Sequence, residues 1–268
     1  SASFETLGIS LFYSSTMANP NTEKIRSSRL AAKILMKALR LGIKPNSLIT
    51  RKSIENALSV VMCIGGSTNA ILHYLAIASS ARIKITLDDI ETIRKRIPVT
   101  CNLKPSGKYA TTDLHKVGGI PQVLKRLASQ GLLHNSCATI TGRVLGEELN
   151  RIKYDTQLKY NVILPINKPL HQQGHLLGLK GNLAIYGAVA KTLGFKRNVI
   201  TGRAKVFNDE ESTTSAILTD RITAGSIVII RYLGPKGGPG MPEMLSPTSA
   251  LVGKELGDKV CLITDGRF

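Results

Sequence analysis

The chain has no tryptophan, few other aromatic residues and half as many acidic as basic residues. Its 36 Lys and Arg against 18 Asp and Glu give a formal net charge of +18, which would suit a nucleic-acid-binding protein. The basic residues are spread along the chain, however, and the densest run is only Arg94 to Arg96. With aromatics at 4%, no base-stacking platform stands out. We therefore expect no nucleic-acid partner and keep a basic nucleic-acid-binding protein as an alternative.

Long hydrophobic runs are absent as well. Apolar stretches such as residues 57–64 and 227–230 fall well short of the roughly 20 residues that cross a bilayer, so no membrane association is expected. The chain begins with Ser1 and its first residues show no signal-peptide pattern, which indicates an internal start. The four cysteines are widely spaced without a C-x-x-C pair and favour a reducing compartment. We expect the cytoplasm, with a plastid or mitochondrion as the alternative in a eukaryote.

Helical periodicity dominates the first half, where apolar residues recur at steps of three and four. Helices are expected over residues 23–41 and 53–63, from Ser67-Thr68-Asn69 through Ala78, from Asp88 toward Pro98, and over residues 122–128. Residues 83–87 alternate between apolar and polar like a strand. This mixture predicts an α/β N-terminal part over residues 1–165.

The second half has a different texture, with short β-rich runs and frequent glycine from about Lys168 onward. The expected strands are residues 176–179, 198–207, 227–232 and 259–264. They predict a second, mostly β domain over residues 166–268, with residues 150–169 as the linker.

A glycine- and proline-rich segment runs from Gly234 to Pro242, and this composition excludes a helix or a central strand. It predicts a rigid loop whose backbone amides can come close to a ligand, although such a loop is by itself typical of a plain turn. Glu243 follows directly and could offer carboxylate oxygens to a hard cation.

The whole segment resembles a signature of the dihydroxy-acid and phosphogluconate dehydratases. Their pattern G-P-K-G-G-P-G-M-x-E-M is matched at residues 234–244, P-T-S-A at residues 247–250 and D-G-R-F at residues 265–268. Residues 10–15 resemble S-L-P-Y-S-S, and residues 65–70 match G-G-S-T-N-A. The string L-K-P-S-G-K-Y, starting at Leu103, is similar to the dihydroxy-acid branch, which leaves a sugar-acid dehydratase as the runner-up.

The resemblance implies a homodimeric hydro-lyase that converts a small-molecule 2,3-dihydroxy-3-methyl acid to a 2-oxo acid in valine and isoleucine synthesis. An iron-sulfur cluster would bind the departing hydroxyl, Mg²⁺ would bind the carboxylate, and a serine would accept the proton. A two-iron cluster is favoured over a four-iron one. The resemblance also implies that residues 1–165 are part of an α/β cluster-binding domain and residues 166–268 part of a barrel-like swivelling domain.

Carried over residue by residue, the resemblance assigns Glu243 as a magnesium ligand. The other magnesium ligands and the cluster cysteines belong to family motifs C-D-K and G-A-C-G-G-M, which the chain does not contain, so no iron-sulfur ligand is expected here. The base serine would follow Phe268, so the catalytic residue is not assigned and this fragment alone is expected to be inactive. Ser67, Thr68 and Asn69 are candidates for binding the substrate anion at a helix start, with a plain N-cap as the alternative.

The cysteines and histidines are predicted to be structural. Cys63 and Cys261 lie in apolar surroundings and Cys101 and Cys137 beside loops, and their spacing fits no cluster-binding run. The same applies to His73 and His115, neither of which has a second ligand at metal-binding spacing.

The chain departs from the family pattern at two places. Ile185 and Tyr186 stand where the family has proline and aspartate, and Leu233 stands where an acid is common. These changes leave a degenerate, non-catalytic remnant open as the alternative to a piece of an active enzyme.

Overall fold

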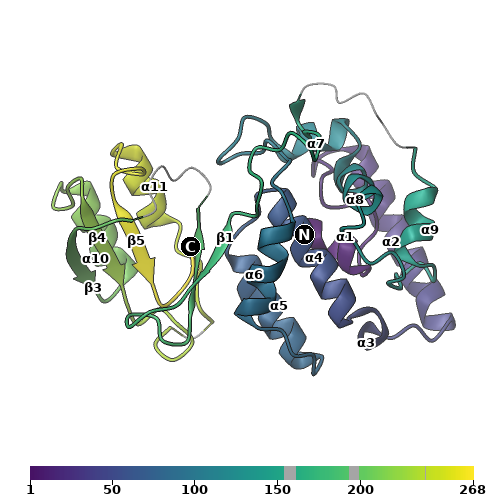
Figure 1. The fold of residues 1–268 in the computed structure, drawn as a ribbon, viewed down its shortest axis with the longest axis horizontal. Helices are drawn as coiled ribbons and strands as arrows, with labels where there is room; N and C mark the ends of the chain where they lie inside the picture. Colours follow the sequence, from purple (N-terminus) through teal and green to yellow (C-terminus); the bar gives the residue numbers. More distant parts are fainter. Residues whose placement is uncertain (154–160, 193–198, 239) are drawn as a thin grey trace. The chain divides into compact units, whose positions relative to one another are not determined.

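The computed structural model describes residues 1–153, 161–192, 199–238 and 240–268 (Figure 1). The chain forms two compact units, Ser1–Leu193 and Gly194–Phe268, which are described separately. The predicted linker includes residues 154–160, which lie outside the described ranges, as does the first residue of the strand predicted over 198–207. The predicted domain boundary between residues 165 and 166 stays a prediction.

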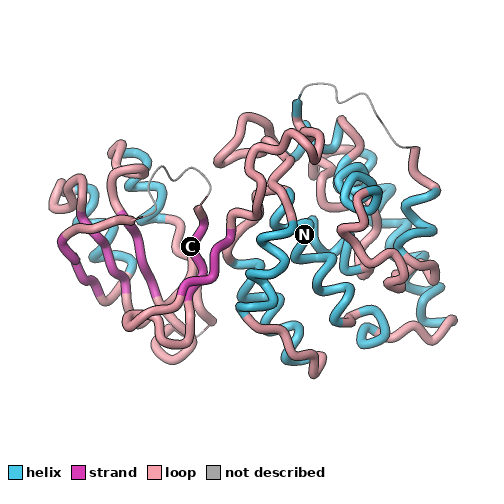
Figure 2. The backbone as a smooth tube through the Cα atoms, in the orientation of Figure 1, coloured by secondary structure: helices cyan, strands magenta, loops and turns pink. Residues whose placement is uncertain are grey.

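Unit 1 consists mainly of helices (Figures 1 and 2). They are α1 (Ala2–Leu7), α2 (Thr22–Arg40), α3 (Pro45–Leu48), α4 (Arg51–Cys63), α5 (Asn69–Ser80), α6 (Leu87–Arg96), α7 (Thr111–Lys116), α8 (Gly119–Ser129) and α9 (Leu145–Asn150). The strands β1 (Leu176–Leu179) and β2 (Ala188–Lys191) pair antiparallel. The described residues of unit 1 thus combine helices with one small sheet, as the sequence predicts in outline.

Helix α4 lies at the centre of the unit 1 core. Its first turn is fixed by a capping box, in which the Thr50 side chain accepts from the Ser53 N–H and the Ser53 side chain accepts from the Thr50 N–H. Ile54, Leu58 and Met62 follow one another at intervals of four and are 0% exposed. Because helices α1, α5, α6 and α8 all contact α4, its apolar surface is buried on several sides.

Helix α2 confirms the predicted surface helix, and it is far more exposed than α4. Only Ala38 among its 19 residues is buried. Ile25, Leu35 and Leu39 are 52%, 54% and 63% exposed in the described structure. The periodic apolar pattern therefore identifies the helix without identifying how deeply its residues lie.

The strand predicted over residues 83–87 is wrong. Residues 83–86 form a loop, and helix α6 begins at Leu87. Thr86 is the N-cap, with its hydroxyl accepting from the Asp89 N–H while the Asp89 carboxylate accepts from the Thr86 N–H. This capping box turns the alternating segment into a helix entry.

Unit 2 contains the strands β3 (Arg203–Phe207), β4 (Ser226–Ile230) and β5 (Cys261–Thr264), with helices α10 (Glu210–Leu218) and α11 (Ser246–Gly253) between them. The three strands are parallel in the order β3-β4-β5. The prediction of a mostly β, barrel-like C-terminal domain is therefore wrong, because the described residues of this unit form a small open sheet with crossover helices.

The parallel pairing accounts for the helices in this unit, because each connection between parallel strands must cross back along the sheet, commonly as a helix. Helix α10 was not predicted from the sequence, because its residues, Glu210–Leu218, lack a clear apolar stripe. It begins where the carboxylate of Asp209 accepts the N–H of Ser212 at 2.6 Å. Ile217, Val228, Met244 and Leu251 form part of the core between these elements.

Candidate functional site

The glycine-rich loop lies between β4 and α11 in unit 2, and two of its glycines are required by close backbone contacts. A Cβ on Gly234 would lie 2.7 Å from the carbonyl oxygen of Asp265. A Cβ on Gly237 would lie 2.7 Å from the carbonyl oxygen of Tyr232. Side chains at these positions would force the loop away from β5 and from its own first residues.

Glu243 stands at the end of this loop, and its side chain is 44% exposed. One of its carboxylate oxygens lies 3.7 Å from Nη1 of Arg267. Glu243 and Arg267 also form an isolated parallel β-bridge, and the Met244 N–H donates to the Arg267 carbonyl at 3.2 Å. The candidate ligand is therefore held at the surface next to a positive charge.

The fit of a metal ion to this site is partial. Glu243 offers hard carboxylate oxygens of the kind that Mg²⁺ prefers. The described residues contain no group of three or more His, Cys, Asp or Glu side chains that could hold a metal ion. Within the described ranges, a cation at Glu243 would thus need further ligands from elsewhere.

The three residues predicted to bind substrate lie in unit 1, at the start of α5. The Asn69 N–H donates to the Ser67 hydroxyl at 3.2 Å. Ser67 is exposed, Thr68 is half-buried and Asn69 is buried. The N-cap of α5 is Thr68, whose side chain makes no capping hydrogen bond, and substrate binding by the three residues stays a prediction.

Cys63, Cys101 and Cys137 are buried, and Cys261 is partly exposed. The Cys63 thiol lies 3.0 Å from the Thr100 hydroxyl. A hydrogen bond between the thiols of Cys63 and Cys101 lowers the pKa of the first and raises that of the second. Because no third ligand joins them in the described structure, these cysteines do not fit an iron-sulfur cluster.

His115 has a carboxylate partner that local spacing could not reveal. Its Nε2 lies 3.1 Å from a Glu23 carboxylate oxygen, across 92 positions of sequence. Its Nδ1 lies 2.9 Å from the Thr16 hydroxyl. His115 therefore links the start of α2 to the segment before it and has a structural role. His73 is exposed on α5.

Glu5 is a residue that the sequence did not single out. It is 0% exposed on α1, and its carboxylate accepts the N–H groups of Tyr13 and Ser15 at 2.8 and 2.9 Å. Burial raises the pKa of this carboxyl above its ordinary value of 4.5. Residues 10–15, one of the motifs in the sequence, are thus folded around a buried acid.

The departures from the family pattern have different surroundings. Ile185 and Tyr186 lie between β1 and β2 and are 74% and 98% exposed. Leu233 is half-buried and packs against the unit 2 core. The apolar residue at 233 is therefore accommodated, whereas nothing in the described structure explains Ile185.

Two surface hollows in the described part of the chain are lined by other residues than these candidates. One of about 570 Å³ in unit 2 is lined by Glu210, Thr214 and Ser246, among others. One of about 320 Å³ in unit 1 is lined by residues that include Arg94 and His175.

None of the described helices is long and apolar enough to span a membrane.

Comparison with known proteins gives a consistent assignment. The models for the dihydroxy-acid/6-phosphogluconate dehydratase N-terminal and C-terminal parts match residues 1–148 and 161–268. Over all 268 residues the chain is 60% identical to dihydroxy-acid dehydratase 1 of Cupriavidus pinatubonensis and to dihydroxy-acid dehydratase of Ralstonia nicotianae, covering 48% of each. The chain thus spans about half the length of these curated relatives.

The second matched range contains the glycine-rich loop, Glu243 and the Asp265-to-Phe268 motif, and the first contains the residues at the start of α5. Since the two ranges together account for most of the sequence, the chain belongs to the dihydroxy-acid/6-phosphogluconate dehydratase family.

Proposed function

We propose that this chain is part of a dihydroxy-acid dehydratase, a hydro-lyase that converts 2,3-dihydroxy-3-methyl carboxylic acids to 2-oxo acids in valine and isoleucine biosynthesis. The observation that carries the proposal is the 60% identity, over the whole chain, to proteins named dihydroxy-acid dehydratase. The L-K-P-S-G-K-Y string from Leu103 to Tyr109 supports this branch over the sugar-acid one.

Glu243 would contribute one carboxylate ligand to Mg²⁺ in this enzyme. A bound magnesium ion would supply positive charge that stabilises the developing charge beside the substrate carboxylate. The partly exposed position of Glu243 supports this role, because 44% of its side chain is accessible to solvent. The iron-sulfur cluster, of the two-iron kind in our proposal, is not assigned to any cysteine of this chain.

The start of α5 would bind the anionic end of the small-molecule dihydroxy acid. Backbone N–H groups at a helix N-terminus attract anions, and α5 is a 12-residue helix that begins at Asn69. Ser67 is exposed and Thr68 half-buried at this start, which supports access for a ligand.

The remaining parts of the proposal concern the whole enzyme. We propose that it is a homodimer in the cytoplasm, with a domain boundary near residues 165 and 166. The bacterial sources of the relatives support the cytoplasm and give no support to a plastid or mitochondrion.

A chimera tests the proposal. The matching segment of the Ralstonia nicotianae enzyme is replaced by this 268-residue chain, and 2-oxo acid formation from 2,3-dihydroxy-3-methylbutanoate and from 6-phosphogluconate is measured. We expect activity on the first substrate, with the unmodified Ralstonia enzyme as the reference. Preference for 6-phosphogluconate would favour the sugar-acid alternative, and a folded but inactive chimera would favour a degenerate remnant.

A further inference from the structure

The D-G-R-F motif at the end of β5 contacts both ends of the glycine-rich loop. Asp265 contacts the residues that lead into the loop, and Arg267 contacts the residues that end it. The motif and the loop are separated in sequence by helix α11. Their contacts are thus tertiary interactions within unit 2.

Asp265 receives two backbone hydrogen bonds at the start of the loop. Its two carboxylate oxygens accept the N–H groups of Tyr232 and Leu233, each at 3.0 Å. A carboxylate that accepts backbone N–H groups makes charge-assisted hydrogen bonds, which are stronger than neutral ones. The Asp265 side chain therefore fixes the direction in which the chain leaves β4.

Arg267 makes the matching contacts at the end of the loop. Its Nε donates to the carbonyl oxygen of Met241 at 2.8 Å, and its Nη1 lies 3.7 Å from the Glu243 carboxylate. Its backbone carbonyl accepts the Met244 N–H. The guanidinium thus contacts both the loop backbone and the candidate ligand.

The two contacts coincide with unusual backbone conformations. Tyr232 has φ of 66° and Met241 has φ of 48°, in the left-handed region that non-glycine residues rarely adopt. Such conformations persist when the surrounding structure holds them. Here the Asp265 carboxylate accepts the Tyr232 N–H, and the Arg267 guanidinium donates to the Met241 carbonyl. These two hydrogen bonds hold Tyr232 and Met241 in their conformations.

We propose that Asp265 and Arg267 are positioning residues that hold the glycine-rich loop at its two ends and thereby set the place of the Glu243 carboxylate. The part that concerns cation binding rests on the proposed role of Glu243. The holding of the loop itself stands on the hydrogen bonds and does not depend on that role.

Amide hydrogen exchange of the 268-residue protein tests the holding of the loop. We expect Asp265→Asn to speed exchange at Tyr232 and Leu233 by about tenfold or more, because hydrogen bonds to a charged group are lost. Arg267→Lys should speed exchange at Met241 instead, because it removes the Nε contact that holds the Met241 carbonyl, while the Met241 N–H donates to the Gly238 carbonyl. Unchanged exchange at all three amides would overturn the proposal.

The matched control is Asp220→Asn. It removes the same charge from the same unit by breaking the exposed ion pair between Asp220 and Lys254, whose atoms lie 2.8 Å apart. Exchange at the loop amides should not change in this variant. If Asp265→Asn fails to fold, Asp265→Glu replaces it, since it keeps the charge but moves the carboxylate away from the Tyr232 and Leu233 N–H groups, and it should speed exchange at the same two amides.

Mn²⁺ serves as the probe for the position of Glu243. Paramagnetic broadening of the Met244 amide signal on titration with Mn²⁺ reports binding beside Glu243, even when binding is weak. We expect broadening in the wild type, none in Glu243→Gln, and a several-fold weaker effect in Asp265→Asn than in Asp220→Asn. A purely structural Asp265 would leave these last two variants equal, which would overturn positioning of the carboxylate.

The two readouts separate the failure of this inference from that of the proposed function. Absence of broadening in the wild type would contradict cation binding by Glu243 in this chain, and the exchange rates would then decide alone whether Asp265 and Arg267 hold the loop. Broadening with unchanged exchange in both loop variants would support the metal ligand and overturn the inference.

Discussion

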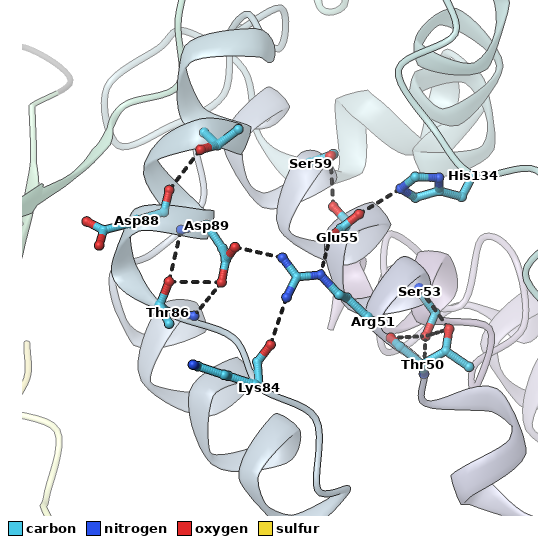
Figure 3. Close-up of polar contacts among 11 residues, drawn as sticks. Thr50, Arg51, Ser53, Glu55, Ser59, Lys84, Thr86, Asp88, Asp89 and His134 are labelled. Carbon is cyan, nitrogen blue, oxygen red and sulfur yellow. Dashed lines mark hydrogen bonds and ion pairs between the residues drawn. The ribbon is translucent and has the colours of Figure 1, made fainter.

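The guanidinium of Arg51 lies 2.6 Å from the carboxylate of Asp89 and joins the first turn of α4 to the first turn of α6 (Figure 3). Arg51 also donates to the Glu55 carboxylate and to the Lys84 carbonyl. Asp89 in turn accepts the N–H and hydroxyl of Thr86. One carboxylate therefore both caps α6 and ties it to α4.

This double role predicts unequal effects of removing the two partners. Asp89→Ala should lower the free energy of unfolding by about 1–2 kcal/mol, because it removes a capping-box residue as well as the ion pair. Arg51→Ala should cost less, since its side chain is 49% exposed and exposed ion pairs contribute little. Urea unfolding of both variants measures the difference, and a larger loss in Arg51→Ala would contradict the prediction.

The Asp89 interaction also predicts a loss of stability in acid. Partial burial by itself raises the pKa of Asp89, but hydrogen bonds from Arg51 and Thr86 outweigh it and lower the pKa below its ordinary 3.8. A carboxyl with a lowered pKa stabilises the fold above its unfolded value and loses this contribution as pH falls through the folded value. The stability difference between wild type and Asp89→Ala should therefore shrink below about pH 3.8 in unfolding curves.

Glu5 predicts a pH dependence of the opposite sign. Because burial raises its pKa above 4.5, its contribution to stability is fully present below pH 4.5 and falls as pH rises through the raised value. Glu5→Gln cannot titrate and loses one of the acceptor oxygens that Tyr13 and Ser15 use, so it should cost about 1–3 kcal/mol. This cost should be larger at pH 5 than at pH 8.

The control for Glu5 is Glu23→Gln, which changes an acid that is 54% exposed and faces His115 in the same unit. Unfolding at both pH values should show a smaller cost for this variant. Equal costs of Glu5→Gln at pH 5 and pH 8 would show that burial does not raise the Glu5 pKa as described.

Sequence periodicity was enough to predict α2, α4 and α5, because a 3.6-residue repeat is a local property. It failed at residues 83–87, where the alternation was overridden by the Thr86 and Asp89 capping box. It also missed α10, and with it the parallel arrangement of β3 and β4, so the barrel-like domain was wrong. Strand order depends on which segments meet in space, and short strands do not encode this by themselves.

The candidate site divides in the same way. Glu243 and the residues from Ser67 to Asn69 were found from motifs, and their ligands stay predictions. The contacts of Asp265 with Leu233, and of His115 with Glu23, span 32 and 92 positions and leave no local pattern. Only the folded chain shows that the D-G-R-F motif holds the glycine-rich loop.

Core position predicts a clear contrast between two leucines of unit 1. Leu58→Ala should lower the free energy of unfolding by about 2–5 kcal/mol, because Leu58 is 0% exposed in the α4 core and its truncation leaves a cavity. Leu35→Ala, on the exposed side of α2, should change it by no more than about 0.5 kcal/mol. Urea unfolding checks both, and similar costs would show that α2 is covered in solution.

The last prediction concerns Glu243 in the chimera with the Ralstonia nicotianae enzyme. Glu243→Gln should lower kcat/KM by at least about 100-fold, because loss of residues that merely support a metal ligand already costs 10- to 100-fold. Glu211→Gln is the matched control, since Glu211 is an exposed acid of the same unit outside the loop. A magnesium ligand further predicts that Glu243→Gln raises the Mg²⁺ concentration for half-maximal activity, whereas a residue that only pairs with Arg267 would lower activity without changing this concentration.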